Sequence, residues 1–150
     1  METDRALPLT ATPSVVGVTA DDDRYLDCRH QAMVIAARED LELILYDWDA
    51  PQLLGDPLPS FWSAEGTEEA VPDRLDEAWL EKAGRGEVAG QVRESTAAGV
   101  PTSAWLPSKH GMDAMAVYAR DHLARTVVVP RDLDADGLGA TFKGMRVVVV

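Results

Sequence analysis

Five short runs of apolar, mostly β-branched residues alternate with longer segments along most of the chain, and this alternation limits the folds available to it. The runs occupy residues 14–19, 41–46, 100–106, 125–129 and 145–150. Apolar residues fill most of each run, which is typical of strands buried on both faces of a parallel sheet. The sequence therefore predicts a three-layer α/β fold with a mostly parallel, five-stranded sheet. We expect the strand order 3-2-1-4-5 of flavodoxin-like and nucleotide-hydrolase-like folds.

Three of the segments between these runs carry apolar residues at helical spacing. Asp22 or Asp23 is expected to N-cap the first helix, and Gly84 and Gly86 are expected to break the second near Arg85. The apolar face of the first helix consists of Tyr25, Cys28, Ala32, Ile35 and Ala36. The second, capped by Asp73, presents Leu75, Trp79, Ala83, Val88, Ala89 and Val92. The third, capped by Ser108, presents Met112, Met115, Ala116, Ala119 and Leu123.

The length of 150 residues indicates one domain, which we place at residues 14–150. Residues 1–13 have no apolar periodicity and are expected to form a flexible tail. Residues 50–72 contain four prolines, a density that prevents both a regular helix and a central strand. We therefore expect a long loop there, with its aromatic residues packed in part on the domain.

Charge and cysteine content exclude several classes of protein. The net charge of −12 makes binding to nucleic acids or to anionic membranes unfavourable. The one cysteine, Cys28, cannot form a disulfide within the chain, so we expect a reducing cytoplasm as its location and a buried structural role for the thiol. No apolar stretch is long enough to span a membrane, and residues 1–10 lack the pattern of a signal peptide.

Four segments resemble the universal stress protein family. They are residues 15–18 (VVGV), 43–46 (LILY), 113–119 (DAMAVYA) and 126–130 (TVVVP), which match the first strand, second strand, third helix and fourth strand of that family. The resemblance implies a five-stranded α/β domain that commonly dimerises and, in some members, binds ATP. It also implies a role in stress survival and no defined catalysed reaction.

The sequence departs from the family at the ATP-binding motifs. ATP-binding members have a V-D-G-S-like pattern after the first strand, where this chain has residues 18–21 (VTAD). They also have G-x2-G-x9-G-[ST] after the fourth strand, but no glycines in residues 130–144 have that spacing. A nucleotide held as in the family would contact Thr19, Ala20, Asp21, Asp47, Pro130, Gly137 and Gly139. We expect no cofactor, and a regulatory or binding module instead of an enzyme.

Acidic residues follow three of the predicted strands, and the carboxyl ends of parallel strands share one edge of the sheet. They are Asp21, Asp22, Asp23, Asp47, Asp49, Asp132, Asp134 and Asp136, with Arg24 and Arg131 beside them in the sequence. Such an edge repels a triphosphate and suits a divalent cation, a cationic partner or no ligand. The alternative function is a nucleotide-binding protein or hydrolase that depends on ATP or Mg²⁺ and uses this edge.

The other candidate constellations have simpler structural explanations. Asp132, Asp134 and Asp136 match the first half of an EF-hand loop, but Lys143 stands where the bidentate glutamate belongs, so a solvated acidic turn is expected. Residues 47–49 (DWD) and the group Ser108, His110 and Asp113 are consistent with a strand-end turn and a helix cap, respectively. We assign no catalytic residue. His30 and His122 are expected on the surface, and Trp105 in the core.

The last apolar run carries the main interaction prediction. In the expected order, it is an edge strand with no charged residue to prevent pairing, built from Val147, Val148, Val149 and Val150. Pairing with its own copy would bury these side chains across a twofold axis. We therefore expect a homodimer formed through this strand, acting on a protein partner that the sequence does not identify.

Overall fold

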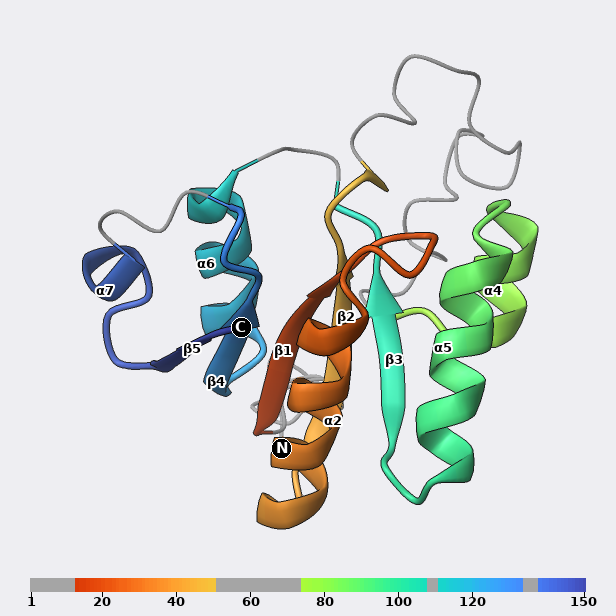
Figure 1. Cartoon of the computed structure of the whole chain (residues 1–150), viewed down its shortest axis with the longest axis horizontal. Coiled ribbons are helices and arrows are strands. Elements are labelled where there is room, and N and C mark those ends of the chain that lie inside the picture. The colour runs from red at the N-terminus through yellow and green to blue at the C-terminus, as the bar shows by residue number, and fades with distance from the viewer. Residues whose placement is uncertain (1–12, 51–73, 108–110, 134–137) are drawn as a thin grey trace, which may run out of the picture.

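The computed structural model describes residues 13–50, 74–107, 111–133 and 138–150 (Figure 1). The strands are β1 (Ser14–Thr19), β2 (Glu42–Asp47), β3 (Thr102–Trp105), β4 (Ala124–Val129) and β5 (Arg146–Val149). The helices are α2 (Leu26–Glu39), α4 (Glu77–Lys82), α5 (Gly86–Ala97), α6 (Met112–Asp121) and α7 (Leu138–Thr141). Each predicted strand is present, within two residues at either end.

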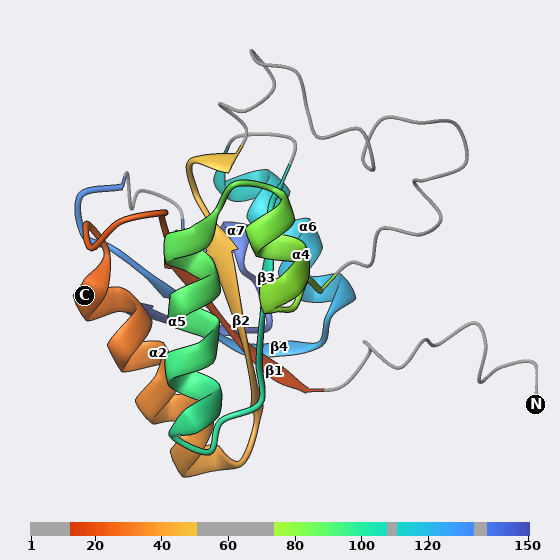
Figure 2. The same cartoon turned by 90° about the vertical axis from the view of Figure 1, so that its right-hand side faces the viewer.

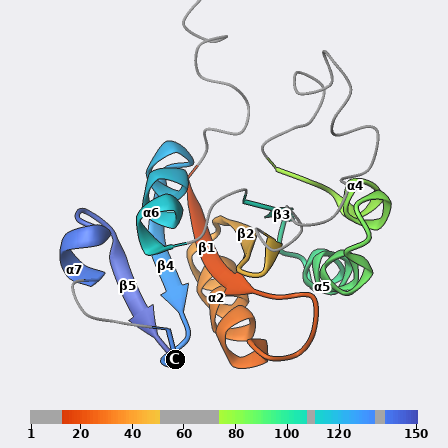
Figure 3. The ribbon, with the colours of Figure 1, turned by 90° about the horizontal axis from the view of Figure 1, so that it is seen from above.

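The strands form one parallel sheet in the order β3-β2-β1-β4-β5, which confirms the predicted topology. Helices α2 and α5 lie side by side on one face, and α6 and α7 lie on the other (Figures 2 and 3). All six residues of β1 are buried, as expected for the central strand of such a sheet. The predicted three-layer α/β class is therefore correct.

The first helix packs closely on β1. Its predicted face is buried, and a Cβ added at Gly17 of β1 would lie 2.7 Å from the Cβ of Ala32. The predicted cap is wrong: Tyr25 occupies the N-cap position, and no side chain donates or accepts a capping hydrogen bond there. The aspartates at positions 22 and 23 instead lie in the loop before the helix.

The second helical region breaks where the glycines predicted it. Helix α4 ends before Gly84, whose φ of +80° is left-handed, and α5 begins at Gly86. Leu75 was placed wrongly in the helix: it is buried beside β3, where it forms an isolated antiparallel bridge with Ala104. Asp76 is the N-cap of α4 and accepts a hydrogen bond from the backbone N–H of Trp79, whereas Asp73 lies outside the described residues.

Two predictions around α6 need correction. The helix ends before Leu123, which is 48% exposed with a positive φ and does not belong to the apolar face. His122, expected on the surface, is 4% exposed because its ring stacks on Tyr118, with 4.1 Å between ring centroids. Trp105, expected in the core, is only partly buried, and Ser108 lies outside the described residues.

Most of the predicted loop at residues 50–72 and of the tail at residues 1–13 also lies outside the described residues. In the part of the chain that the structure describes, no helix is both long and apolar enough to cross a membrane.

Candidate functional site

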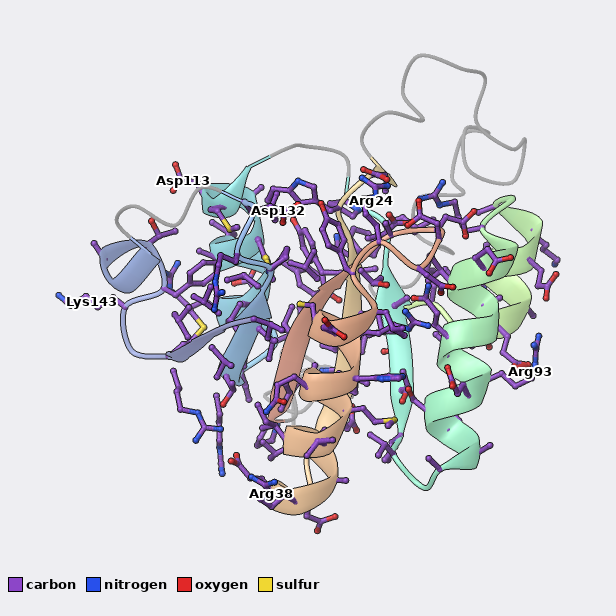
Figure 4. All side chains as sticks on the ribbon, in the orientation of Figure 1. Arg24, Arg38, Arg93, Asp113, Asp132 and Lys143 are labelled. Carbon is purple, nitrogen blue, oxygen red and sulfur yellow. The ribbon has the colours of Figure 1, made fainter. Side chains whose placement is uncertain are left out.

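The carboxyl ends of β1, β2 and β4 meet at one edge of the sheet, because the strands are parallel. The loops that follow these strands bring together most of the aspartates that the sequence analysis singled out. Arg24 and Asp132 both lie at this edge (Figure 4). The arrangement is best described as two parts, one around β2 and one between α2 and β4.

A buried ion pair closes the edge at the end of β2. The Asp47 side chain is 0% exposed and accepts two hydrogen bonds from Arg85, from Nε at 2.8 Å and from Nη2 at 2.9 Å. Arg85 reaches it from the break between α4 and α5, where Gly84 turns the chain. Two parallel N–H···O bonds are the strongest geometry for this pair of groups. The break between the helices thus positions the cation that neutralises Asp47.

Burial and pairing act in opposite directions on Asp47. Loss of solvent raises the pKa of its carboxyl group, and the charge and hydrogen bonds of Arg85 lower it, with burial the larger effect. The carboxylate also accepts a hydrogen bond from the backbone N–H of Asp49 at 3.0 Å. Its oxygens therefore have three donors within the chain, and this carboxylate is used for structure.

The loop after β1 is attached to α5 by two further contacts. The Asp21 carboxylate accepts a hydrogen bond from the backbone N–H of Val88 at 3.0 Å and so caps α5 from a distant part of the chain. Thr19 donates from Oγ1 to Oε1 of Gln91 at 2.6 Å, and Gln91 donates back to the carbonyl oxygen of Ala20 at 3.0 Å. The polar groups at the positions where the family has its first nucleotide motif are therefore hydrogen-bonded to α5.

Arg24 joins the loops after β1 and β2. Its guanidinium group forms ion pairs with Asp49 and Asp22, and it lies over the Tyr25 ring, 5.2 Å from the centroid. These two carboxylates raise the pKa of Arg24. The pKa of Asp22 is lowered, first by a hydrogen bond from the backbone N–H of Arg24 at 2.8 Å and then by the guanidinium group.

A small pocket of about 220 Å³ lies between the start of α2 and the loop after β4. Its lining consists of Arg24, Tyr25, Asp27, Cys28, Pro130, Arg131, Asp132 and Val150. The loop is held against the last strand because the N–H of Arg131 donates to the carbonyl oxygen of Val150 at 2.8 Å. Charges of both signs line the pocket, so its electrostatic preference is weak.

Cys28 lies at the inner wall of this pocket but is not a reactive thiol. The side chain is buried, and its Sγ donates to the carbonyl oxygen of Val128 at 3.2 Å. Burial raises the pKa of the thiol to about 12, and Asp132 adds to the effect. The structural role predicted for Cys28 agrees with this geometry.

The residues predicted for a nucleotide or metal site fall into four groups. Thr19, Ala20, Asp21 and Asp47 come together around Arg85 and Gln91, two residues that the sequence analysis did not place at the site. Pro130 and Asp132 lie at the pocket beside α2, and Gly139 lies in α7. The remaining predicted residues Asp134, Asp136 and Gly137 lie outside the described residues, as does His110.

One feature of the sequence could have indicated Arg85. It stands between two glycines at a predicted helix break, a position from which a long side chain can reach a neighbouring loop. Gln91 carries no comparable signal, because a glutamine on a helix is usually solvated. The sequence indicated mainly acids at this edge. The structure adds Arg85, which neutralises Asp47, and Gln91, which forms hydrogen bonds with Thr19 and Ala20.

The described residues contain no group of three His, Cys, Asp or Glu side chains arranged to hold a metal ion. Asp21, Asp47 and Asp49 instead have arginine or backbone N–H partners. Carboxylates engaged in this way do not present the open oxygen cluster that Mg²⁺ or Ca²⁺ requires.

Comparison with known proteins gives similarity of structure without clear similarity of sequence. No family model matches the chain, and no curated protein matches it either. A universal stress protein from Archaeoglobus fulgidus superimposes with a TM-score of 0.53 over 92% of each chain, at 14% identity. A universal stress protein in complex with cAMP gives a TM-score of 0.52 at 19% identity, over 93% of this chain and 97% of that chain.

A third structure, of a universal stress protein family member from Burkholderia pseudomallei, gives 0.52 at 11% identity, over 95% of this chain and 98% of that chain. These matches extend over nearly the whole length of both partners. The chain therefore has the fold of universal stress proteins, as the four sequence segments predicted.

Proposed function

We propose that this chain is a regulatory binding module of the universal stress protein type that forms homodimers and does not bind ATP. The fold and the four matching segments support the type of protein. A role in the stress response follows from that type, and the single buried cysteine suits the reducing cytoplasm.

The observation that carries the proposal is the internal use of polar groups at the carboxyl edge. Asp47 and Arg85 neutralise each other, Asp21 caps α5, and Gln91 accepts a hydrogen bond from the Thr19 hydroxyl group. Ligand pockets for molecules of nucleotide size usually measure about 300–1,000 Å³. The pocket beside α2 offers about 220 Å³, and Asp132 on its wall opposes a triphosphate.

A second function, binding of a small nucleotide, is favoured by one observation. Arg24 and Arg131 line the pocket at the start of α2, where a helix N-terminus adds partial positive charge. One structural neighbour is a universal stress protein in complex with cAMP, a monoanionic nucleotide. The alternative therefore concerns this pocket and a ligand with less charge than ATP.

Isothermal titration with ATP, with and without Mg²⁺, and with cAMP separates the two functions. The protein must first be shown by its absorbance ratio to carry no co-purified nucleotide. We expect no heat of binding up to millimolar ATP. Micromolar binding of ATP would overturn the proposal, and binding of cAMP that Arg131→Gln weakens would establish the alternative.

The dimer part of the proposal concerns β5. This strand lies at the end of the sheet and pairs with β4, and no other described strand pairs with its outer edge. Val149 is 38% exposed, although a valine run of this kind is usually covered. Each valine fully buried by a second copy would contribute about 1.5 kcal/mol.

Val148→Lys tests the dimer interface. A charge in the middle of the strand should weaken the dimer by about tenfold or more, measured by sedimentation equilibrium over a range of concentrations. Val34→Lys is the matched control, because Val34 is 41% exposed on α2 and lies in a hollow with Ala98 and Val100, which follow α5. A dimer that is as stable in Val148→Lys as in Val34→Lys would contradict the strand-mediated interface.

A further inference from the structure

A second pocket lies on the opposite face of the sheet, between α6 and β3. Ala114, Val117, Tyr118 and Asp121 form one wall, and their spacing of i, i+3, i+4 and i+7 places them on a single face of α6. Trp105 and Pro107, from the end of β3, lie opposite, and Tyr46 of β2 completes the lining. The volume is about 340 Å³, within the usual range for small ligands.

Three aromatic rings line the pocket, and Trp105 is the most exposed of them: Tyr46 is 1% exposed, and Tyr118, on which His122 also stacks, is 9% exposed. The Tyr118 ring stacks on Trp105, with 5.6 Å between centroids and 5° between planes, and it meets Tyr46 edge-on at 5.6 Å. Trp105 is only partly buried, so part of its indole ring remains open to a ligand. The faces of aromatic rings carry negative potential and attract cations, most strongly in tryptophan.

Asp121 gives the pocket a negative charge at its rim. Its exposed carboxylate forms no ion pair or hydrogen bond with any residue that the structure describes, and it is the last residue of α6. The C-terminus of a helix carries partial negative charge, so a carboxylate there is unfavourable for the isolated helix. Asp121 and the end of α6 therefore both make the potential at the pocket negative. A bound cation would reduce the repulsion between them.

Two arginines near α6 in the described part of the chain have partners outside the pocket. Arg74 forms an ion pair with Glu42 and donates from Nε to Nδ1 of His122 at 3.4 Å, so its charge is already compensated. Arg120 donates to the carbonyl oxygen of Thr141 at 3.3 Å, on the side of α6 that faces α7. Neither arginine is among the residues that line the pocket.

We propose that this pocket binds a small organic cation with an alkylated nitrogen, such as a quaternary ammonium group. The open part of the Trp105 ring would contact the methyl groups, and Asp121 would supply the counter-charge. A group of this type gains from cation–π attraction and has no N–H donors that would need hydrogen-bond partners in an apolar pocket. The site shares no residue with the pocket beside α2, and its test is independent of the ATP titration.

The probe is choline, compared with 3,3-dimethylbutan-1-ol, which has the same shape and no charge. Binding is measured by two-dimensional NMR titration, which also reports whether each variant remains folded. We expect choline to bind about tenfold or more tightly than the neutral alcohol, with the largest shifts at the Trp105 indole N–H. A trimethyllysine peptide, titrated in parallel, distinguishes a free cation from a protein side chain as the natural source of this group.

Asp121→Asn should weaken choline binding by about fivefold to tenfold while the binding of the alcohol stays unchanged. Asp113→Asn is the matched control: it removes the same charge from the same helix, at its first turn, where the side chain points outward (Figure 4). Equal affinity for choline and the alcohol, equal loss in the two variants, or no binding of choline at 50-fold excess over the protein would each overturn the proposal.

Discussion

The two halves of the sheet differ in how far their strands and polar groups are covered within the chain. Around β1 and β2, covered by α2 and α5, the strands are almost fully buried, and the acids of their loops are paired with arginines or backbone N–H groups. Around β5, the strand is only partly covered, and the neighbouring helix α7 has four residues. The acids around β1 and β2 thus have partners within the chain, whereas the outer edge of β5 pairs with no other strand that the structure describes.

This difference shows why a count of acidic residues predicts little about the field at a site. The carboxylates after β1 and β2 are abundant in the sequence, yet Asp47 is fully buried against Arg85, and Asp49 pairs with Arg24. Arg24 lies in the loop before α2, and Arg85 lies between α4 and α5, so only the folded chain brings them to these aspartates. The net potential at this edge is therefore much weaker than the sequence indicated, and its acids serve the fold before they serve any ligand.

The largest effect is expected from Arg85→Ala. It leaves the Asp47 carboxylate buried without its cation, and loss of one partner from a buried pair costs about 3–5 kcal/mol of unfolding free energy. Urea denaturation at pH 7 measures the loss. Arg93→Ala is the control, because Arg93 is 58% exposed and its ion pairs with Glu77 and Glu81 are worth about 1 kcal/mol at most. Similar losses in both variants would contradict the role of the buried Asp47–Arg85 pair in stabilising the end of β2.

The same variant has a defined dependence on pH. Burial already raises the pKa of Asp47, and removal of Arg85, which lowers that pKa, raises it further. A carboxyl group whose pKa is higher in the folded than in the unfolded state destabilises the fold when ionised. The loss of unfolding free energy in Arg85→Ala, relative to the wild type, should therefore be complete above the pKa that Asp47 has in the folded variant. It should shrink as the pH falls through that pKa towards 4. A deficit that is constant from pH 7 to pH 4 would exclude Asp47 as its source.

A smaller loss is expected from Gly17→Ala, in the strand that α2 covers. The new Cβ would lie 2.7 Å from Cβ of Ala32, so strand and helix must separate, at a cost of about 1–3 kcal/mol. Thermal unfolding measures it. Gly90→Ala in α5 provides the contrast, because the nearest atom lies at 3.8 Å and alanine favours a helix by about 0.5–1 kcal/mol. Destabilisation by both substitutions would mean that α5 is packed as tightly as α2.

The sequence allowed prediction of the fold because its strands and helix faces are local patterns. The five apolar runs and the break at Gly84 and Gly86 need no long-range information, and the structure has both. The pairing of Asp47 with Arg85 spans 38 positions and depends on where the helix break falls in space. His122 was misplaced for a similar reason, since its burial depends on the ring of Tyr118 and on a contact with Arg74.

The smallest effect is expected from Arg24→Gln, at the boundary between the two parts of the carboxyl edge. Arg24 is 45% exposed and Asp22 54%, so solvent screens their attraction, and the substitution should cost about 1 kcal/mol or less in urea denaturation. The backbone N–H that lowers the pKa of Asp22 remains in the variant. NMR titration should therefore find the pKa of Asp22 still below its ordinary value of 3.8, so its stabilising effect is still lost only as the pH falls through that lowered pKa. A loss as large as that of Arg85→Ala would show instead that the charges beside the pocket stabilise the fold as much as the pair at β2 does, and the two parts of the carboxyl edge would then not differ in this respect.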